Sequence, residues 1–310
     1  MSRHLSIVFV ALCLAACASR SAPATQGTAK AFDASKSEPK AVEIADAVLA
    51  ALGGEANWAN AKEVQWVQMI IIDGKLQDWG MHAWDRWNGR HHYKRLYADG
   101  NASVSMHELY TETGSAYIET AKGSVEQTKD DQKKIIDEAK KRFELDTYIL
   151  FMPYKLKDPG VKLKFSEERQ EIGAPQDAPM KYDVIQITFD EGVGSGAGDT
   201  WYLSVDKQTK VPFMVEHVAA GKPDNERGGF LLEDWKDAGG VKFATKRVTL
   251  GYTKLDGPKV KVVIPPNWQK KVSIQPMDVP SPGEIVLIGD LKVSAEPDDE
   301  LYIPRVRTPN

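Results

Sequence analysis

Cysteine is nearly absent from this sequence. Of its 310 residues only Cys13 and Cys17 carry a thiol, and both precede residue 18. The rest of the chain can form no disulfide, and it offers no thiolate for nucleophilic catalysis or metal binding. The folded part of the protein must therefore be held together by a hydrophobic core.

Long hydrophobic runs and an excess of positive charge are also missing. The longest apolar stretch runs from Leu5 to Ala16, interrupted only by Ser6, and it is shorter than the roughly 20 residues that a membrane-spanning helix requires. The formal net charge is −4, and acidic and basic residues are interspersed without a basic stripe. We therefore expect neither a transmembrane helix nor a nucleic-acid partner.

Sequence motifs of common enzymes are absent as well. The glycine-rich stretch 190–199, DEGVGSGAGD, lacks the lysine of a phosphate-binding loop and joins two predicted strands. Neither a G-x-S-x-G nor an H-E-x-x-H motif occurs. We expect no catalytic residue, no cofactor, and a flexible loop at 190–199. A hydrolase with a site assembled from distant strands stays open as an alternative.

A β-hairpin is predicted around Asn88-Gly89, the dipeptide that most strongly favours a two-residue hairpin turn. With such a turn, Trp84 lies opposite Tyr93 and Asp85 lies opposite His92. The Asp85–His92 pair would then contribute about 0.2–1 kcal/mol to stability.

The histidines are the first candidates for a metal site. The five that follow residue 17 are His82, His91, His92, His107 and His217. A zinc site needs about three converging protein ligands. Neighbouring histidines such as His91 and His92 point to opposite faces of a strand. The predicted hairpin also places Arg86 and Arg95 on the face of His82, where they would repel a cation. We therefore expect no metal site.

The start of the chain has the features of a secretory signal peptide. Arg3 precedes the apolar stretch, and small residues follow it. Leu14-Ala15-Ala16-Cys17 resembles the lipobox of bacterial lipoproteins, in which the cysteine becomes the acylated first residue. The resemblance predicts a signal peptide at 1–16, removal of Cys13, and a membrane anchor through lipid on Cys17. Because Ala18 and not Asp follows the cysteine, it also predicts the periplasmic face of the outer membrane.

Three further parts are predicted after the cleavage site. Residues 17–38 hold too little apolar surface to fold and are expected to be a tether with a reach of roughly 25 Å. Residues 39–264 are expected to form the folded domain. Residues 265–310, which are rich in proline, are expected to be a tail docked on that domain.

Residue periodicity predicts an α+β domain. Apolar residues recur at helical spacing over 39–52, and Gly53-Gly54 ends this helix. The stretch VQWVQMIII at 64–72 is apolar on both faces, so it should be covered on both. Beyond the hairpin at 78–97, strands are expected at 102–110, 115–121, 161–169, 181–190, 200–206, 211–219, 229–236, 241–252, 258–264 and 284–288.

A second helical stretch interrupts the strands at 128–153. Thr128 and Asp131 resemble a capping box at its start, and Pro153 ends it. Over 129–144 apolar residues form one face and lysines the other. The segment 145–152 is apolar nearly all round and is expected to be buried.

The order of these elements is similar to that of the LolA/LolB-type lipoprotein carriers, in which a curved, incomplete β-barrel covered by helices encloses an apolar cavity. Three stretches resemble one bacterial family of that superfamily more closely: ALGGEANWANAKEVQW (51–66), MPYKLKDPGVKLKF (152–165) and GDTWYLSVDKQTKVPFMVEH (198–217). The resemblance covers roughly residues 40–255. It implies a curved antiparallel sheet with an N-terminal helix and a buried helical insertion, and it implies no catalytic residue.

Taken together, these features predict a membrane-anchored protein that binds or carries an acyl chain, a lipid or a lipoprotein. The residues expected to contact the ligand are Trp66, Met69, Ile70, Ile71, Ile72, Trp84, Tyr93 and Leu150. The alternative is an interaction module of the envelope with a filled core. A continuous cavity would distinguish the first function from the second.

Overall fold

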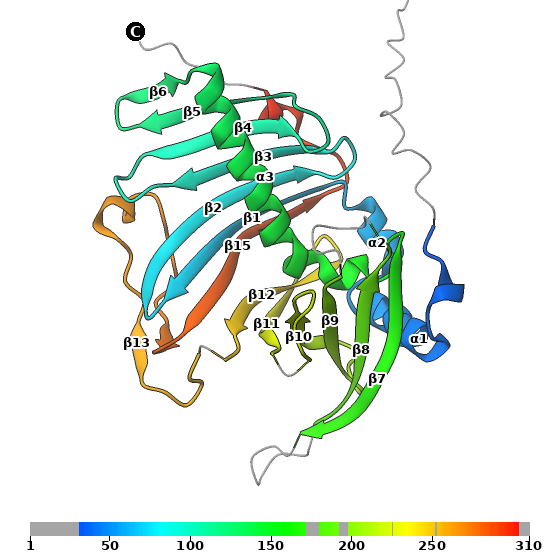
Figure 1. Cartoon of the computed structure of the whole chain (residues 1–310). Helices are drawn as coiled ribbons and strands as arrows, with labels where there is room; N and C mark the ends of the chain where they lie inside the picture. Colours follow the sequence, from blue (N-terminus) through cyan, green and yellow to red (C-terminus); the bar gives the residue numbers. More distant parts are fainter. Residues whose placement is uncertain (1–30, 172–179, 192–197, 225, 252, 304–310) are drawn as a thin grey trace, which may run out of the picture.

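The computed structural model describes residues 31–171, 180–191, 198–224, 226–251 and 253–303. Within these ranges, thirteen antiparallel strands form one open sheet, and three α-helices pack against it (Figure 1). The predicted α+β class and the unclosed sheet are confirmed. Both cysteines and residues 192–197 of the glycine-rich stretch lie outside the described residues.

The sheet consists of two meanders that are joined by a strand from the end of the chain. The first meander contains β1 (Glu63–Ile72), β2 (Lys75–Asp85), β3 (Arg90–Leu96), β4 (Ala102–Glu108), β5 (Gly114–Thr120) and β6 (Gly123–Glu126). The second contains β7 (Val161–Glu171), β8 (Met180–Phe189), β9 (Thr200–Asp206), β10 (Pro212–Val218), β11 (Gly228–Ala238) and β12 (Val241–Thr249).

The joining strand is β15 (Glu284–Ser294), which pairs with β1 on one side and with β12 on the other. The sequence predicts only a short strand at 284–288 within a docked tail. In the structure, residues 284–294 form a central strand of the sheet instead.

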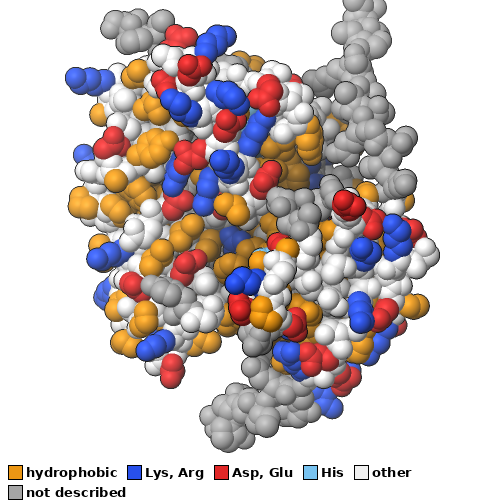
Figure 2. Space-filling model, in the orientation of Figure 1, with side chains coloured by type: hydrophobic (Ala, Val, Ile, Leu, Met, Phe, Trp, Pro, Cys, Tyr) orange, Lys and Arg blue, Asp and Glu red, His pale blue; other side chains and the backbone are white. Residues whose placement is uncertain are grey.

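The helices are α1 (Pro39–Ala51), α2 (Gly54–Asn60) and α3 (Lys129–Phe151). Helix α3 connects the two meanders and crosses one face of the sheet (Figure 1). Its N-terminus is capped as predicted, because the Thr128 hydroxyl accepts a hydrogen bond from the backbone N–H of Asp131 at 3.2 Å. Charged side chains of both signs alternate along its outer surface (Figure 2).

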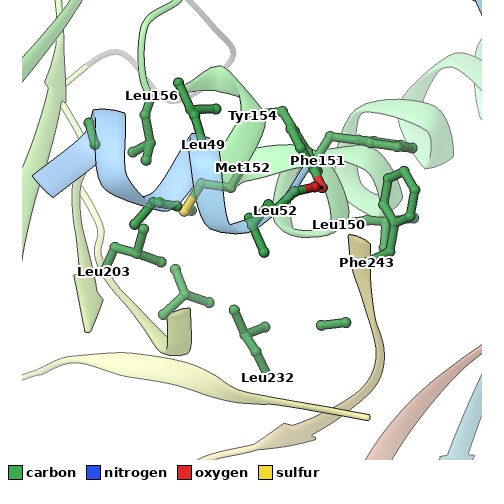
Figure 3. Packing of buried hydrophobic residues seen from close by; sticks show 14 of the residues in the cluster. Leu49, Leu52, Leu150, Phe151, Met152, Tyr154, Leu156, Leu203, Leu232 and Phe243 are labelled. Carbon is green, nitrogen blue, oxygen red and sulfur yellow. Dashed lines mark hydrogen bonds between the residues drawn. The ribbon is translucent and has the colours of Figure 1, made fainter. Parts of the chain in front are cut away.

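The main hydrophobic core lies where α1, the end of α3 and the second meander meet. In Figure 3, Leu52, the C-cap residue of α1, lies among Phe151, Tyr154 and Phe243 of three other segments. The Tyr154 hydroxyl, in the 3₁₀ turn η2 (Met152–Lys155), donates a hydrogen bond to the Leu52 carbonyl at 3.1 Å. The contact between α1 and η2 therefore fixes the C-terminal end of α3.

A second core covers the opposite face of β1. Val67, Met69 and Ile71 pack there against Trp268 and Val272. The covering segment contains β13 (Lys259–Lys261), η3 (Pro266–Trp268) and β14 (Asp278–Pro280). A further 3₁₀ turn, η4 (Asp299–Tyr302), lies beyond β15. Strand β1 is thus apolar on both faces and covered on both, as the sequence predicts.

The register of the β2–β3 hairpin differs from the predicted one. The observed pairs are Trp84–His91 and Asp85–Arg90, where the sequence predicts Trp84–Tyr93 and Asp85–His92. That prediction is therefore wrong by two residues. A shift of two keeps every side chain on its predicted face, because side chains alternate along a strand.

The buried carboxylate of Asp85 explains why the turn begins two residues earlier in the sequence than predicted. It accepts hydrogen bonds from the backbone N–H groups of Trp87 at 3.0 Å and Asn88 at 2.9 Å, and it pairs with Arg90 at 2.6 Å. These contacts close a four-residue loop over 86–89 in place of the two-residue turn. Gly89 still has the left-handed conformation, with φ +69°, that the turn signal predicts.

The last part of the predicted tether is ordered along the edge of β7. The Glu38 N–H donates to the Leu163 carbonyl at 2.9 Å, and the Leu163 N–H donates to the Ser37 hydroxyl at 2.9 Å. Lys36, in the 3₁₀ turn η1 (Ala34–Lys36), pairs with Asp190 at 2.7 Å. Residues 33–38 therefore cover part of an otherwise open sheet edge.

Candidate functional site

An apolar cavity of about 530 Å³ opens beside the C-terminal half of α3. It lies between α3, η2 and the strands β7 and β8, and most of its lining is hydrophobic. The hydrophobic side chains are Tyr110, Phe143, Tyr148, Met152, Leu156, Pro159, Val161, Ile187 and Phe189. Its volume falls within the roughly 300–1,000 Å³ of small-molecule sites.

Regular spacing on both walls produces this lining. On α3, Phe143 and Thr147 are four residues apart and therefore lie on one side of the helix. On β8, Ile187 and Phe189 are two residues apart and share one face of the strand. The ring of Tyr148 bridges the two walls, with its centroid 6.3 Å from that of Phe189.

Three charged residues, Glu144, Lys155 and Asp158, also line the cavity. Asp158 lines an adjoining groove as well, which contains Arg86. Burial lowers the pKa of Lys155 and raises the pKa of Asp158. The Arg86 guanidinium lies 3.5 Å from the Trp58 ring centroid and donates to the Trp58 carbonyl at 2.6 Å. Burial lowers its pKa to about 10.

The other side of α3 faces a row of buried polar side chains. His82 Nδ1 lies 3.1 Å from His91 Nε2, and His91 Nδ1 lies 3.4 Å from His107 Nε2. His82 Nε2 lies 3.3 Å from Asp146 Oδ2 of α3. We call His82, His91 and His107 the histidine row; they come from the adjacent strands β2, β3 and β4. A proton on each Nε2 would satisfy all three contacts.

Asp146 connects the histidine row to further charged groups. Its Oδ1 accepts hydrogen bonds from Gln68 and pairs with Arg142 at 2.9 Å. Gln68 in turn accepts a hydrogen bond from Arg247 of β12 at 2.6 Å. Asp146 is only 4% exposed, so the carboxylate is buried and paired at the same time.

Burial dominates the electrostatics of this cluster. It lowers the pKa of His82 and His91, and together with the nearby ammonium of Lys140 it lowers the pKa of His107 to about 4. Burial alone would raise the pKa of Asp146. The hydrogen bond with His82 and the charge of Arg142 outweigh it and hold this pKa below its usual value. The row therefore consists of neutral imidazoles beside an ionised carboxylate.

None of the eight residues predicted to contact a ligand lines the cavity. Trp66 is 1% exposed and stacks on His82 at 4.4 Å between ring centroids. Ile70, Trp84 and Leu150 belong to or pack against the main core, Met69 and Ile71 belong to the second core, and Tyr93 and Ile72 lie elsewhere on β3 and β1. Their contact with a ligand stays a prediction.

The predicted buried segment 145–152 has a more specific role than the sequence suggests. Leu145 is 65% exposed, so the expectation that the whole segment is buried is wrong there. Thr147, Tyr148 and Met152 line the cavity, whereas Asp146 and Leu150 are buried away from its lining. Asp146 is a charged residue within this mainly apolar segment, and that is the sequence signal for a polar partner on the sheet.

The part of the chain that the structure describes contains no group of three or more histidine, cysteine, aspartate or glutamate side chains arranged to hold a metal ion. Within the same residues, no helix has both the length and the apolar composition needed to cross a bilayer.

Comparison with known proteins yields similarities to solved structures only, because no protein-family model and no curated protein matches the chain. A DUF1329 family protein from Desulfovibrio piger has a TM-score of 0.38 and 10% identity, with 80% of this chain and 96% of that chain covered. An outer membrane lipoprotein-sorting protein domain from Vibrio parahaemolyticus has a TM-score of 0.39 and 9% identity, with 85% and 96% covered.

A LolA superfamily protein from Nitrosomonas europaea has a TM-score of 0.32 and 8% identity, with 81% of this chain and 97% of that chain covered. All three TM-scores are below 0.5, so these similarities support no argument about ligand or site.

Proposed function

We propose that this protein is a lipid-anchored protein of the cell envelope that binds the apolar chain of a lipid or a lipoprotein in the cavity beside α3. The observation that carries the proposal is the cavity itself, with a volume of about 530 Å³ and a mainly hydrophobic lining. An envelope interaction module with a filled core would not contain it.

The energetics suit an acyl chain. Burial contributes about 0.8 kcal/mol per methylene group, so eight methylene groups would stabilise the complex by roughly 6 kcal/mol. Such binding needs apolar area and few hydrogen bonds. The lining side chains of α3 and β8, including Phe143 and Ile187, supply that area.

The proposed location of the protein in the cell envelope is inferred from the residues around Cys17. Lipid on Cys17 would attach the chain to a membrane, and the absence of Asp at position 18 favours the periplasmic face of the outer membrane. Under this proposal, the predicted tether at residues 17–38 keeps the folded domain and its cavity close to the membrane surface.

The test uses the chain from residue 18 onward, which keeps every described element. Binding of a fluorescent fatty acid is titrated, and native mass spectrometry detects co-purified lipid. We expect saturable binding that Phe189→Glu weakens at least tenfold, because it places a charge in the cavity wall. Phe213→Glu is the matched control, since Phe213 is also half-buried but packs on Tyr182, away from the cavity.

Two results would contradict the proposal. One is the absence of both co-purified lipid and saturable binding in the unmodified chain. The other is equal binding by the Phe189→Glu and Phe213→Glu variants, provided that both remain folded by circular dichroism.

A further inference from the structure

Lys155 is a cation set into the lining of a mainly apolar cavity. It lies between the buried residues Tyr154 and Leu156, and its side chain is itself partly buried. Among the described residues, its ammonium group has no hydrogen-bond or ion-pair partner. The partly buried ammonium group therefore gains no hydrogen bond or ion pair from these residues, and an anionic partner in the cavity would stabilise it.

Two charged groups of opposite sign act on Lys155. They are Asp158 and Arg86. The charges of Asp158 and Arg86 cancel, so the ammonium of Lys155 remains as the net charge of the three groups. The remaining acidic residue of the lining, Glu144, is exposed.

A lysine two residues away shows the contrasting arrangement. Lys157 pairs with Asp46 at 2.8 Å and with Glu55 at 3.0 Å, and it does not line the cavity. Its charge is therefore already compensated within the protein. Lys155 forms no ion pair of this kind among the described residues, and it lines the cavity.

From this contrast we infer that the ligand is an amphiphile with an acyl chain and an anionic head group, and that Lys155 binds the head group. The inference rests on the proposed function and specifies the chemistry of its ligand. The hydrophobic walls take the chain, and the ammonium donates charge-assisted hydrogen bonds to a carboxylate or a phosphate.

The experiment measures displacement of a neutral apolar dye, N-phenyl-1-naphthylamine, from the chain that begins at residue 18. The competitors are palmitate, palmitoyl lysophosphatidate and methyl palmitate, each below its micelle concentration. We expect at least one of the two anionic competitors to displace the dye at a concentration at least tenfold lower than methyl palmitate. The stronger of the two identifies the head group as a carboxylate or a phosphate.

Three variants assign the preference to Lys155. Lys155→Met should abolish the difference between charged and neutral competitors, and Lys155→Arg should restore most of it. Lys157→Met removes the same charge outside the cavity and should leave the difference intact. Retention of folding is checked for each variant by its thermal unfolding transition.

The outcomes separate this inference from the proposed function. If methyl palmitate competes as well as both anions, or if Lys155→Met keeps the preference, the inference is wrong although the cavity still binds acyl chains. If neither the dye nor any competitor binds saturably, the proposed function fails and the inference fails with it.

Discussion

Acidification should destabilise this protein through the histidine row. His91 is fully buried and His107 is 4% exposed, and burial lowers the pKa of both. An unfolded histidine has a pKa of about 6.5. Below that pH the unfolded chain binds more protons than the folded one, so the free energy of unfolding falls as the pH decreases. The loss continues until the folded-state pKa is reached, which is about 4 for His107.

The magnitude follows from the pH interval. One pKa unit corresponds to about 1.36 kcal/mol, and pH 5 lies about 1.5 units below the pKa of an unfolded histidine. Each imidazole that stays neutral in the folded state therefore loses about 2 kcal/mol of stabilisation between pH 7 and pH 5. His91 and His107 together account for about 4 kcal/mol, a large share of a typical total of about 5–15 kcal/mol.

Urea unfolding followed by tryptophan fluorescence at pH 8, 7, 6 and 5 measures this loss. The unmodified chain should lose about 4 kcal/mol or more between pH 7 and 5 and little between pH 8 and 7. His107→Gln, which cannot titrate, should lose about 2 kcal/mol less over the same interval. Identical pH dependence of the two proteins would refute the reasoning, because the buried imidazole would then not be the group that titrates on unfolding.

Three other perturbations test separate features. Asp146→Asn should lower the free energy of unfolding by about 3–5 kcal/mol, because it removes the buried carboxylate that His82, Gln68 and Arg142 contact. Glu144→Gln, at an exposed position of α3, should change it by less than about 0.5 kcal/mol. Urea titrations measure both values. Gly53→Ala should lower the midpoint of thermal unfolding more than Gly54→Ala. Both glycines have positive φ, so this strain is common to the two variants. A Cβ on Gly53 would lie 2.0 Å from the Gly240 carbonyl oxygen, whereas a Cβ on Gly54 would meet nothing within 4 Å. Cys17→Ala should block lipid attachment and release the folded domain from membranes; mass spectrometry of the extracted N-terminus checks this, and an unmodified chain that begins elsewhere would contradict it.

Local sequence rules account for most of the secondary structure. The strand expected at 200–206 is β9, and the β-branched stretch 64–72 is β1 with one more residue at its start. These elements follow from alternation and turn residues, which depend on neighbours in the chain. The short helix α2 was missed because Gly53-Gly54, which ends α1, also begins a second helix.

Contacts between segments that are distant in the sequence could not be predicted from these local rules. The hairpin register depends on hydrogen bonds from the Asp85 carboxylate to the turn, which dipeptide preferences do not include. The central position of β15 depends on pairing with β1 across most of the chain length. The histidine row requires three strands in one register and an aspartate from α3, so its members could be named from sequence but not brought together.

The central position of β15 also determines the order in which the sheet can be completed. Each meander pairs only strands that follow one another in the chain, so both can form while the polypeptide is still being made. Their junction must wait for residues 284–294, because β1 and β12 have no direct pairing with each other. Until then, each meander presents a long unpaired edge at what becomes the middle of the sheet. A premature stop codon or a proteolytic cut before residue 284 would make those edges permanent and open to pairing with other chains.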